Sequence, residues 1–154
     1  MALNPGDKAP NFKLATDGSG SVSLSALKGR PFVLYFYPKD DTSGCTKEAI
    51  AFSQIAKKLE KLGVTVIGVS KDTVESHNKF KSKYRLSIVL GSDPETKTAA
   101  DYGVWVEKSM YGRKYMGMER ATYLVNAQGR IHALWRKVKV PGHAEAVLEA
   151  AKTL

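Results

Sequence analysis

Residues 32–48 read FVLYFYPKDDTSGCTKE and contain the only cysteine of the chain, Cys45. The apolar run at 32–37 is typical of a central strand that is buried on both faces. A helical pattern of apolar residues follows at 47–62. This layout places the Cys45 thiol in the first turn of a helix, where free N–H groups and the helix dipole stabilise a thiolate. A cysteine buried for packing alone does not need the flanking proline, threonine and glycine, so we interpret Cys45 as a reactive residue.

Length and composition indicate one ordinary globular domain over residues 1–154, with 43% hydrophobic and 25% charged residues. No apolar run approaches the roughly 20 residues of a membrane span. The first residues lack the basic and apolar regions of a signal peptide. A single cysteine excludes an intrachain disulfide and a tetrathiolate zinc site, so the expected compartment is the reducing cytoplasm.

The net charge of +9 raises the question of nucleic-acid binding. The basic residues are dispersed, and neither an aromatic-interleaved basic platform nor zinc-finger spacing accompanies them. They group loosely at 57–61, 79–85 and 136–139. We therefore interpret the charge as a solvated basic surface and expect neither nucleic acid nor membrane as a partner.

Strand and helix patterns alternate along the chain. The expected strands lie at 12–16, 22–24, 32–37, 64–70, 88–90, 115–119, 121–125 and 130–136. The expected helices lie at 47–62, from a cap at 72–73 to about 84, within 94–102, and after 141–142. This order predicts an α/β thioredoxin-like fold, in which helices flank a central mixed sheet that carries an N-terminal β-hairpin.

On such a fold, thiol chemistry is expected at the end of the first central strand. The usual motif there is Cys-x-x-Cys, whereas this chain has Thr42-Ser43-Gly44-Cys45. A hydroxyl cannot form a disulfide, but it can donate and accept hydrogen bonds to a small, oxygen-rich molecule. The motif therefore favours attack of the Cys45 thiolate on a small polar substrate such as hydrogen peroxide.

The pattern Pro38-x-x-x-Thr42-x-x-Cys45 resembles the peroxidatic signature of the peroxiredoxins. The similarity is strongest to the bacterioferritin-comigratory-protein, or PrxQ, subfamily. Further matching stretches follow in the same order along the chain, at 6–12, 35–40, 45–48, 110–114, 117–123 and 135–143.

The resemblance implies a role for each residue of the motif. Cys45 would attack the nearer peroxide oxygen and become a sulfenic acid. Thr42 would hydrogen-bond the thiolate and the peroxide, while Pro38 would shield the thiolate from water. The backbone N–H groups of Gly44 and Cys45 would complete a polar cradle for the substrate.

Two charged residues complete the implied site. Arg120 would lie beside the sulfur, stabilise the thiolate and stabilise negative charge on the departing oxygen. Glu48, one helical turn after Cys45, would hydrogen-bond Arg120 and orient it. Taken singly, Pro38, Thr42 and Glu48 are ordinary residues for the start of a helix. Their combination with Arg120 favours a functional interpretation.

The chain departs from many PrxQ-like proteins because it has no resolving cysteine. The positions that carry it in relatives are here Ile50, or lie near Lys81 or Ala99. An external thiol, thioredoxin or glutaredoxin with glutathione, must therefore close the cycle in a one-cysteine mechanism. A dimer linked through two Cys45 residues, and an engineered chain from which a resolving thiol was removed, remain alternatives.

Other polar residues near the motif are assigned no catalytic role. Asp40 and Asp41 are interpreted as a solvated loop, and Tyr37 and Trp135 as packing residues. A second ion pair at Arg136 is left open. The three histidines, His77, His132 and His143, lack ligand spacing, so no metal and no cofactor are expected.

The sequence thus predicts a monomeric, thiol-dependent peroxidase that reduces hydrogen peroxide and organic hydroperoxides. The alternative is a non-catalytic thioredoxin-like binding or chaperone module. A thiol–disulfide oxidoreductase would need a second cysteine, and a nucleic-acid binder is suggested by charge alone.

Overall fold

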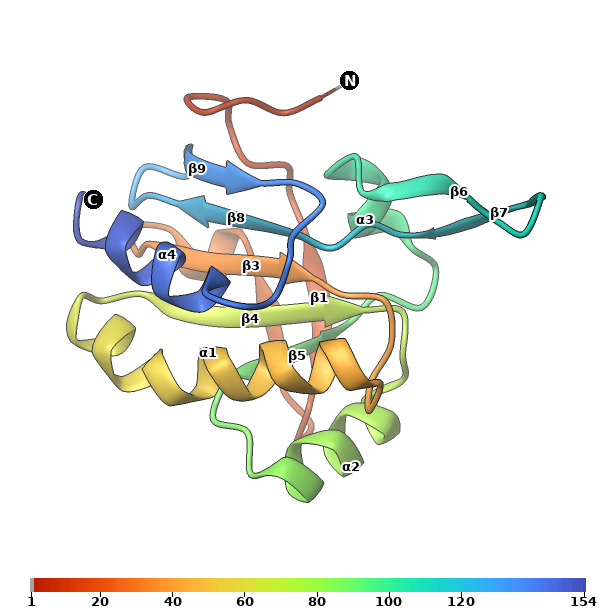
Figure 1. Ribbon diagram of the computed structural model, residues 1–154. Helices are drawn as coiled ribbons and strands as arrows, with labels where there is room; N and C mark the ends of the chain where they lie inside the picture. Colours follow the sequence, from red (N-terminus) through yellow and green to blue (C-terminus); the bar gives the residue numbers. More distant parts are fainter. Residues whose placement is uncertain (1) are drawn as a thin grey trace.

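The computed structural model describes residues 2–154, and its centre is a seven-stranded sheet with the order β2-β1-β5-β4-β3-β8-β9 (Figure 1). The three middle strands β5, β4 and β3 are parallel, and the outer strands are antiparallel to their neighbours. The strands of this sheet are β1 (Lys13–Thr16), β2 (Ser21–Ser23), β3 (Phe32–Phe36), β4 (Thr65–Ser70), β5 (Val89–Ser92), β8 (Ala121–Val125) and β9 (Ile131–Trp135). The predicted mixed sheet is confirmed, and the N-terminal hairpin β1–β2 is part of it.

Four α-helices surround the sheet, and local signals fix where they begin and end. They are α1 (Ser43–Lys61), α2 (Val74–Tyr84), α3 (Lys97–Asp101) and α4 (His143–Ala151), with a short 3-10 turn at Ser25–Leu27. The Thr73 side chain accepts a hydrogen bond from the Ser76 N–H at 3.1 Å and so caps α2, as predicted. The helix α1 ends where Gly63 adopts a positive φ of 77°.

The strand β3 divides the hydrophobic core into two halves. Every residue of β3 is buried, which confirms the prediction of a strand covered on both faces. Val33 and Tyr35 face the core beneath α1 and α4, which Phe80 of α2 also joins. Phe32 and Leu34 face the opposite core, where α3 contributes Ala99 and the segment before β1 contributes Phe12.

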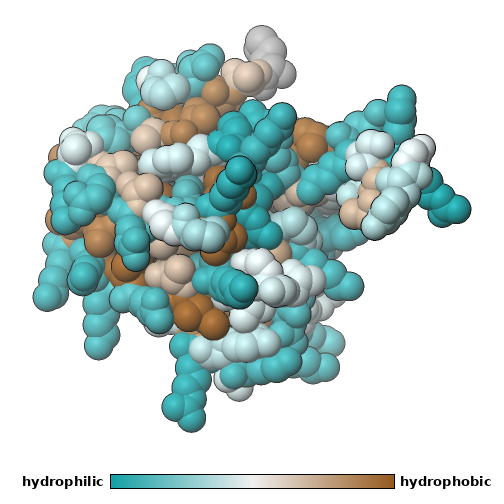
Figure 2. Space-filling view, in the orientation of Figure 1, coloured by the Kyte–Doolittle hydropathy of each residue, from teal (hydrophilic) through white to brown (hydrophobic). Residues whose placement is uncertain are grey.

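The sequence patterns did not predict a strand at β6 (Trp105–Met110). It pairs with β7 (Arg113–Met118) in a separate two-stranded sheet. This hairpin projects from the body of the molecule (Figures 1 and 2), and it exposes Met110, Tyr111, Tyr115 and Met116. Because a projecting hairpin buries few of its side chains, its strands lack the apolar alternation that marks the central sheet.

No helix among residues 2–154 combines the length and the apolar character that crossing a membrane requires.

Gly68 of β4 is a close-approach position, since a Cβ atom built there would lie 2.7 Å from Cζ of Tyr35 on the neighbouring strand. We expect Gly68→Ala to lower the free energy of unfolding by about 1–3 kcal/mol, because the clash is with a buried ring that cannot swing away. Urea denaturation measures this loss. The control Tyr111→Ala, at a side chain that is 99% exposed, should leave the unfolding midpoint unchanged. Equal midpoints for Gly68→Ala and the native chain would contradict the close packing of β3 on β4.

Candidate functional site

The thiol of Cys45 lies at the start of α1, directly beyond the carboxyl end of β3. Cys45 is the third residue of the helix, and its relative exposure is 2%. Thr42 is the N-cap residue, and its carbonyl accepts the first helical hydrogen bond from the Thr46 N–H at 2.8 Å. The N–H groups of residues 43–45 have no acceptor among the described residues. The sulfur therefore lies beside free donors at the positive end of a helix.

Arg120 lies 75 residues after Cys45 in the sequence, and its side chain contacts the sulfur. Its Nη2 donates a hydrogen bond to Cys45 Sγ at 3.3 Å, and its Nη1 donates to Glu48 Oε1 at 2.6 Å. Arg120 directly precedes β8, and the pairing of Ala121 with Phe36 places the start of β8 beside the end of β3. The antiparallel pairing of these two strands thus brings residue 120 to the loop that carries the thiol. The structure brings Cys45, Glu48 and Arg120 together.

Glu48 is almost completely buried, with a side-chain exposure of 1% against 17% for Arg120. Burial raises the pKa of Glu48 to about 7, although the adjacent Arg120 guanidinium works in the opposite direction. One carboxylate oxygen, Oε2, has no hydrogen-bond partner within residues 2–154. Glu48 is therefore a carboxyl group whose charge, and whose hold on Arg120, changes near neutral pH.

The other motif residues, Pro38, Thr42 and Gly44, lie in the turn and the first helical residues that lead to Cys45. The Thr42 hydroxyl donates to the Lys39 carbonyl at 2.8 Å, and no hydrogen bond joins it to Cys45 in the described chain. Its oxygen lone pairs remain free to accept a hydrogen bond. A Cβ atom at Gly44 would lie 3.3 Å from Arg120 Nη2, so glycine permits the close approach of the guanidinium. Pro38 is half-buried in the turn between β3 and α1.

His143, the first residue of α4, lies close to this site. Its Nε2 shares a hydrogen bond with Thr122 Oγ1 at 2.7 Å, and its ring packs edge-on against Phe52 and Trp135. Burial, together with the positive charge of Arg120, lowers the pKa of His143 to about 4. His143 is therefore neutral at physiological pH, and Arg120 supplies the positive charge of the site.

Arg136 does form a second ion pair, a possibility that the sequence left open. Its Nε donates to the carboxylate of Glu119, the residue before Arg120, and its Nη2 donates to the Gly103 carbonyl at 3.0 Å. This ion pair holds the chain at Glu119, directly before Arg120, whose guanidinium contacts Cys45. Among residues 2–154, no group of three or more histidine, cysteine, aspartate or glutamate side chains is arranged to hold a metal ion.

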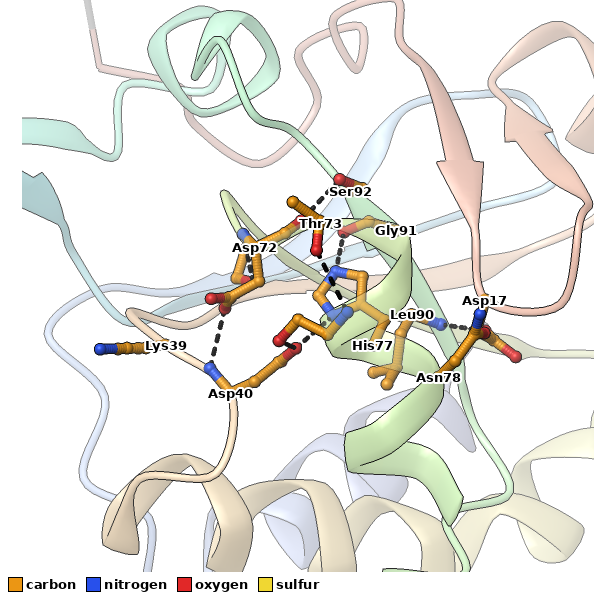
Figure 3. Close-up of polar contacts among 12 residues, drawn as sticks. Asp17, Lys39, Asp40, Asp72, Thr73, His77, Asn78, Leu90, Gly91 and Ser92 are labelled. Atoms are coloured by element: carbon orange, nitrogen blue, oxygen red, sulfur yellow. Dashed lines mark hydrogen bonds and ion pairs between the residues drawn. The ribbon is translucent and has the colours of Figure 1, made fainter. Parts of the chain in front are cut away.

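The interpretation of Asp40 as part of a solvated loop is wrong. Asp40 is buried, and its carboxylate meets His77 of α2 at 2.7 Å (Figure 3). Tyr37, interpreted as a packing residue, also donates its hydroxyl proton to Asp40 at 2.6 Å. A signal was present in the sequence, because His77 lies one helical turn before the apolar Phe80 and thus on the buried face of α2. Asp41, by contrast, is exposed as expected and pairs with Lys83.

Comparison with known proteins identifies close relatives along nearly the full length. The sequence model of the AhpC/TSA family matches residues 5–134. The chain is 49% identical to a putative peroxiredoxin bcp of Coxiella burnetii over 96% of this chain and 98% of the relative. It is 44% identical to peroxiredoxin Bcp of Bacillus subtilis over 100% of this chain and 98% of the relative.

Solved structures of PrxQ proteins superimpose on this chain along nearly its whole length. A cysteine-to-serine mutant of Xylella fastidiosa PrxQ superimposes with a TM-score of 0.93 at 39% identity, covering 99% of this chain and 98% of that one. Xanthomonas campestris peroxiredoxin Q gives a TM-score of 0.89 at 41% identity, covering 92% and 90%. Another structure of the Xanthomonas campestris bacterioferritin comigratory protein concerns its alkyl peroxide reduction activity. The predicted thioredoxin-like fold is thereby confirmed.

The raised pKa of Glu48 predicts a pH dependence in the reactivity of Cys45 toward hydrogen peroxide. As the pH rises through about 7, Glu48 ionises and holds Arg120 more firmly, so the rate should rise in the native protein. Glu48→Gln cannot ionise, so its rate with hydrogen peroxide should not rise near pH 7. Because the variant has lost a charge-assisted hydrogen bond to Arg120, its rate above pH 7 should be about tenfold lower than that of the native protein. Stopped-flow measurements from pH 5 to pH 8.5 (roughly the window around a carboxyl titration) test this. Superimposable native and variant profiles would contradict the assignment.

Proposed function

The chain belongs to the AhpC/TSA family as a peroxiredoxin of the Bcp/PrxQ type, and we propose that it reduces hydroperoxides by a one-cysteine mechanism centred on Cys45. The observation that carries this proposal is the 3.3 Å hydrogen bond from Arg120 Nη2 to the sulfur of the only cysteine. A guanidinium at this distance stabilises a thiolate, which is the nucleophilic form of the side chain.

In the first step, the Cys45 thiolate attacks the terminal oxygen of the peroxide, and the O–O bond breaks. The sulfur is oxidised to a sulfenic acid, while the departing oxygen takes up a proton and leaves as water or an alcohol. Arg120 also faces the site where negative charge develops on the departing oxygen, so it stabilises the transition state. The alkyl peroxide reduction of the Xanthomonas campestris protein supports organic hydroperoxides as substrates alongside hydrogen peroxide.

The surrounding groups bind the peroxide. The Thr42 hydroxyl proton is directed to Lys39, so its oxygen accepts a hydrogen bond from the peroxide O–H. The free N–H groups of Gly44 and Cys45 donate to the peroxide oxygens. Pro38 carries no N–H group and covers the turn, which limits the access of water to the sulfur. Glu48 orients Arg120 through the 2.6 Å hydrogen bond.

Reduction of the sulfenic acid needs a thiol from another molecule. The first external thiol displaces water from the sulfenic acid and forms a mixed disulfide with Cys45. A second thiol then attacks this disulfide, which releases the Cys45 thiol and leaves the reductant as a disulfide. Thioredoxin, or glutaredoxin with glutathione, fits this role. The position of the resolving thiol in many relatives is here Ile50, and in others it lies near Lys81 or Ala99; Cys45 is the only cysteine of the chain, so no second thiol competes with the external one.

The proposal predicts a long-lived sulfenic acid on Cys45. Mixing the reduced protein with one equivalent of hydrogen peroxide without oxygen, followed by dimedone, should give a single adduct at Cys45 within seconds. Excess peroxide should add further oxygens to the same sulfur, because nothing traps the sulfenic acid. Intact-mass spectrometry and peptide mapping measure both products, and Cys45→Ser is the control that gives neither. An unmodified mass at excess peroxide would refute the mechanism and favour a non-catalytic binding or chaperone module.

A further inference from the structure

A buried polar cluster joins the loop at 37–42 to the helix α2 and the strand β5 (Figure 3). The Asp40 carboxylate accepts hydrogen bonds from the Tyr37 hydroxyl at 2.6 Å and from the Ser76 hydroxyl at 2.8 Å. His77 Nδ1 lies 2.7 Å from Asp40 Oδ2, and its Nε2 lies 3.0 Å from the Gly91 carbonyl oxygen. The His77 side chain has no exposed surface, and that of Asp40 is 4% exposed.

The partners of His77 determine where its protons lie. A carbonyl oxygen can only accept, so Nε2 donates to Gly91. On the other side of the ring, Nδ1 and Asp40 Oδ2 share a hydrogen bond. Every polar atom of the two side chains is satisfied, which makes the buried pair stable as long as both members are present.

The helix that carries His77 is fixed to the sheet by contacts of its own. Lys81 Nζ pairs with Asp17 at 2.7 Å, and Asn78 accepts a hydrogen bond from the Gly18 N–H at 2.7 Å. Asp17 in turn accepts the Leu90 N–H of β5 at 2.9 Å. The helix α2 is therefore a rigid support for the loop, and the position of His77 dictates the position of Asp40.

Asp40 is the buried point at which the loop is attached to this support, whereas Asp41 pairs with Lys83 of α2 at the exposed surface. The backbone N–H of Asp40 also donates to Asp72 Oδ2 at 2.8 Å, so both its main chain and its side chain are bound. Thr42, the N-cap residue of α1, follows two residues later. The loop that leads into α1 is thus held by the Asp40–His77 pair, and the first turns of α1 are held by Arg120, which contacts Cys45 and Glu48.

We propose that Asp40 and His77 are positioning residues of the peroxidase reaction. Their buried pair sets the distance between the Thr42 hydroxyl and the Cys45 sulfur, and thereby aligns the bound peroxide with the thiolate. This inference rests on the proposed function, since it assigns the pair to the step in which the sulfur attacks peroxide. The pair does not touch the sulfur, so the thiolate itself depends on Arg120 and the helix N-terminus.

The proposal predicts a separation of two reactions of the same sulfur. In Asp40→Asn and His77→Gln, sulfenic acid formation with hydrogen peroxide should slow at least about tenfold, because small displacements of a reacting group cost up to about 100-fold. The rate of alkylation of Cys45 by iodoacetamide should change by less than about twofold in the same variants, because this reaction does not use Thr42. The double variant should react no more slowly than the slower single variant, because the two residues act as one unit.

Asp41→Asn is the matched control, since it removes the neighbouring carboxylate, which pairs with Lys83 of α2 at the exposed surface. An exposed ion pair contributes little, so this variant should retain native rates in both reactions. Ser76→Ala removes one donor to Asp40 without leaving a charge unpaired, so it should fold and should show a smaller loss of the peroxide rate alone. Circular dichroism identifies any variant that has not folded, and Ser76→Ala then decides the question.

Native peroxide rates in Asp40→Asn, His77→Gln and Ser76→Ala would overturn the positioning role, as would equal losses in both reactions or additive losses in the double variant. The proposed function is judged separately, because it fails only if the native protein forms no sulfenic acid. A native protein that forms one, with variants that form it equally fast, removes the positioning role and leaves the peroxidase mechanism intact.

Discussion

The hydrogen bond between Arg120 and Cys45 is the interaction on which the site depends. Cys45 is only 2% exposed, so little water is available to stabilise a charge on its sulfur. The Arg120 guanidinium and the free N–H groups at the start of α1 take the place of that water. Glu48 fixes the same guanidinium from the other side. Removing Arg120 would leave both the sulfur and a buried carboxyl group without their shared partner, so the three residues act as one unit.

The pairing of the central strands produces this contact. Arg120 and Cys45 are 75 residues apart, yet the antiparallel pairing of β8 with β3 places them beyond the same end of these two strands. The strand β3 is buried on both faces, and Gly68 lets the Tyr35 ring lie against β4. The rigidity of the central sheet is therefore what keeps a long-range contact within 3.3 Å.

The sequence was most informative where local chemistry is strong. The apolar run of β3, the Thr73 cap of α2 and the thiol in the first turn of α1 were all predicted, because each depends on neighbouring residues. The β6 strand was not, because it pairs with the other strand of its own hairpin and none of its side chains is fully buried, so the apolar alternation is absent. Asp40 was misinterpreted for a related reason: a carboxylate in a polar loop resembles a solvated residue until His77, 37 positions away, is placed beside it.

Two opposing requirements meet at the start of α1. The peroxide step favours a first turn that is held firmly between Arg120 and the Asp40–His77 pair. In the proposed mechanism, the reductive step requires an external thiol to reach Cys45, a residue that is only 2% exposed. Because the chain has no second cysteine, the first turn of α1 does not have to unwind to bring Cys45 to an internal thiol. In the structure this turn is helical and is held by Arg120 through Cys45 and Glu48.

The stabilisation of a Cys45 thiolate by Arg120 is the central claim, and the ultraviolet absorbance of the thiolate measures it directly. The native protein at pH 7 should show the thiolate band, which Cys45→Ser should lack entirely. Arg120→Met should lose most of the band while retaining the native circular dichroism spectrum. An Arg120→Met protein with undiminished thiolate absorbance, or a native protein with none, would contradict the account.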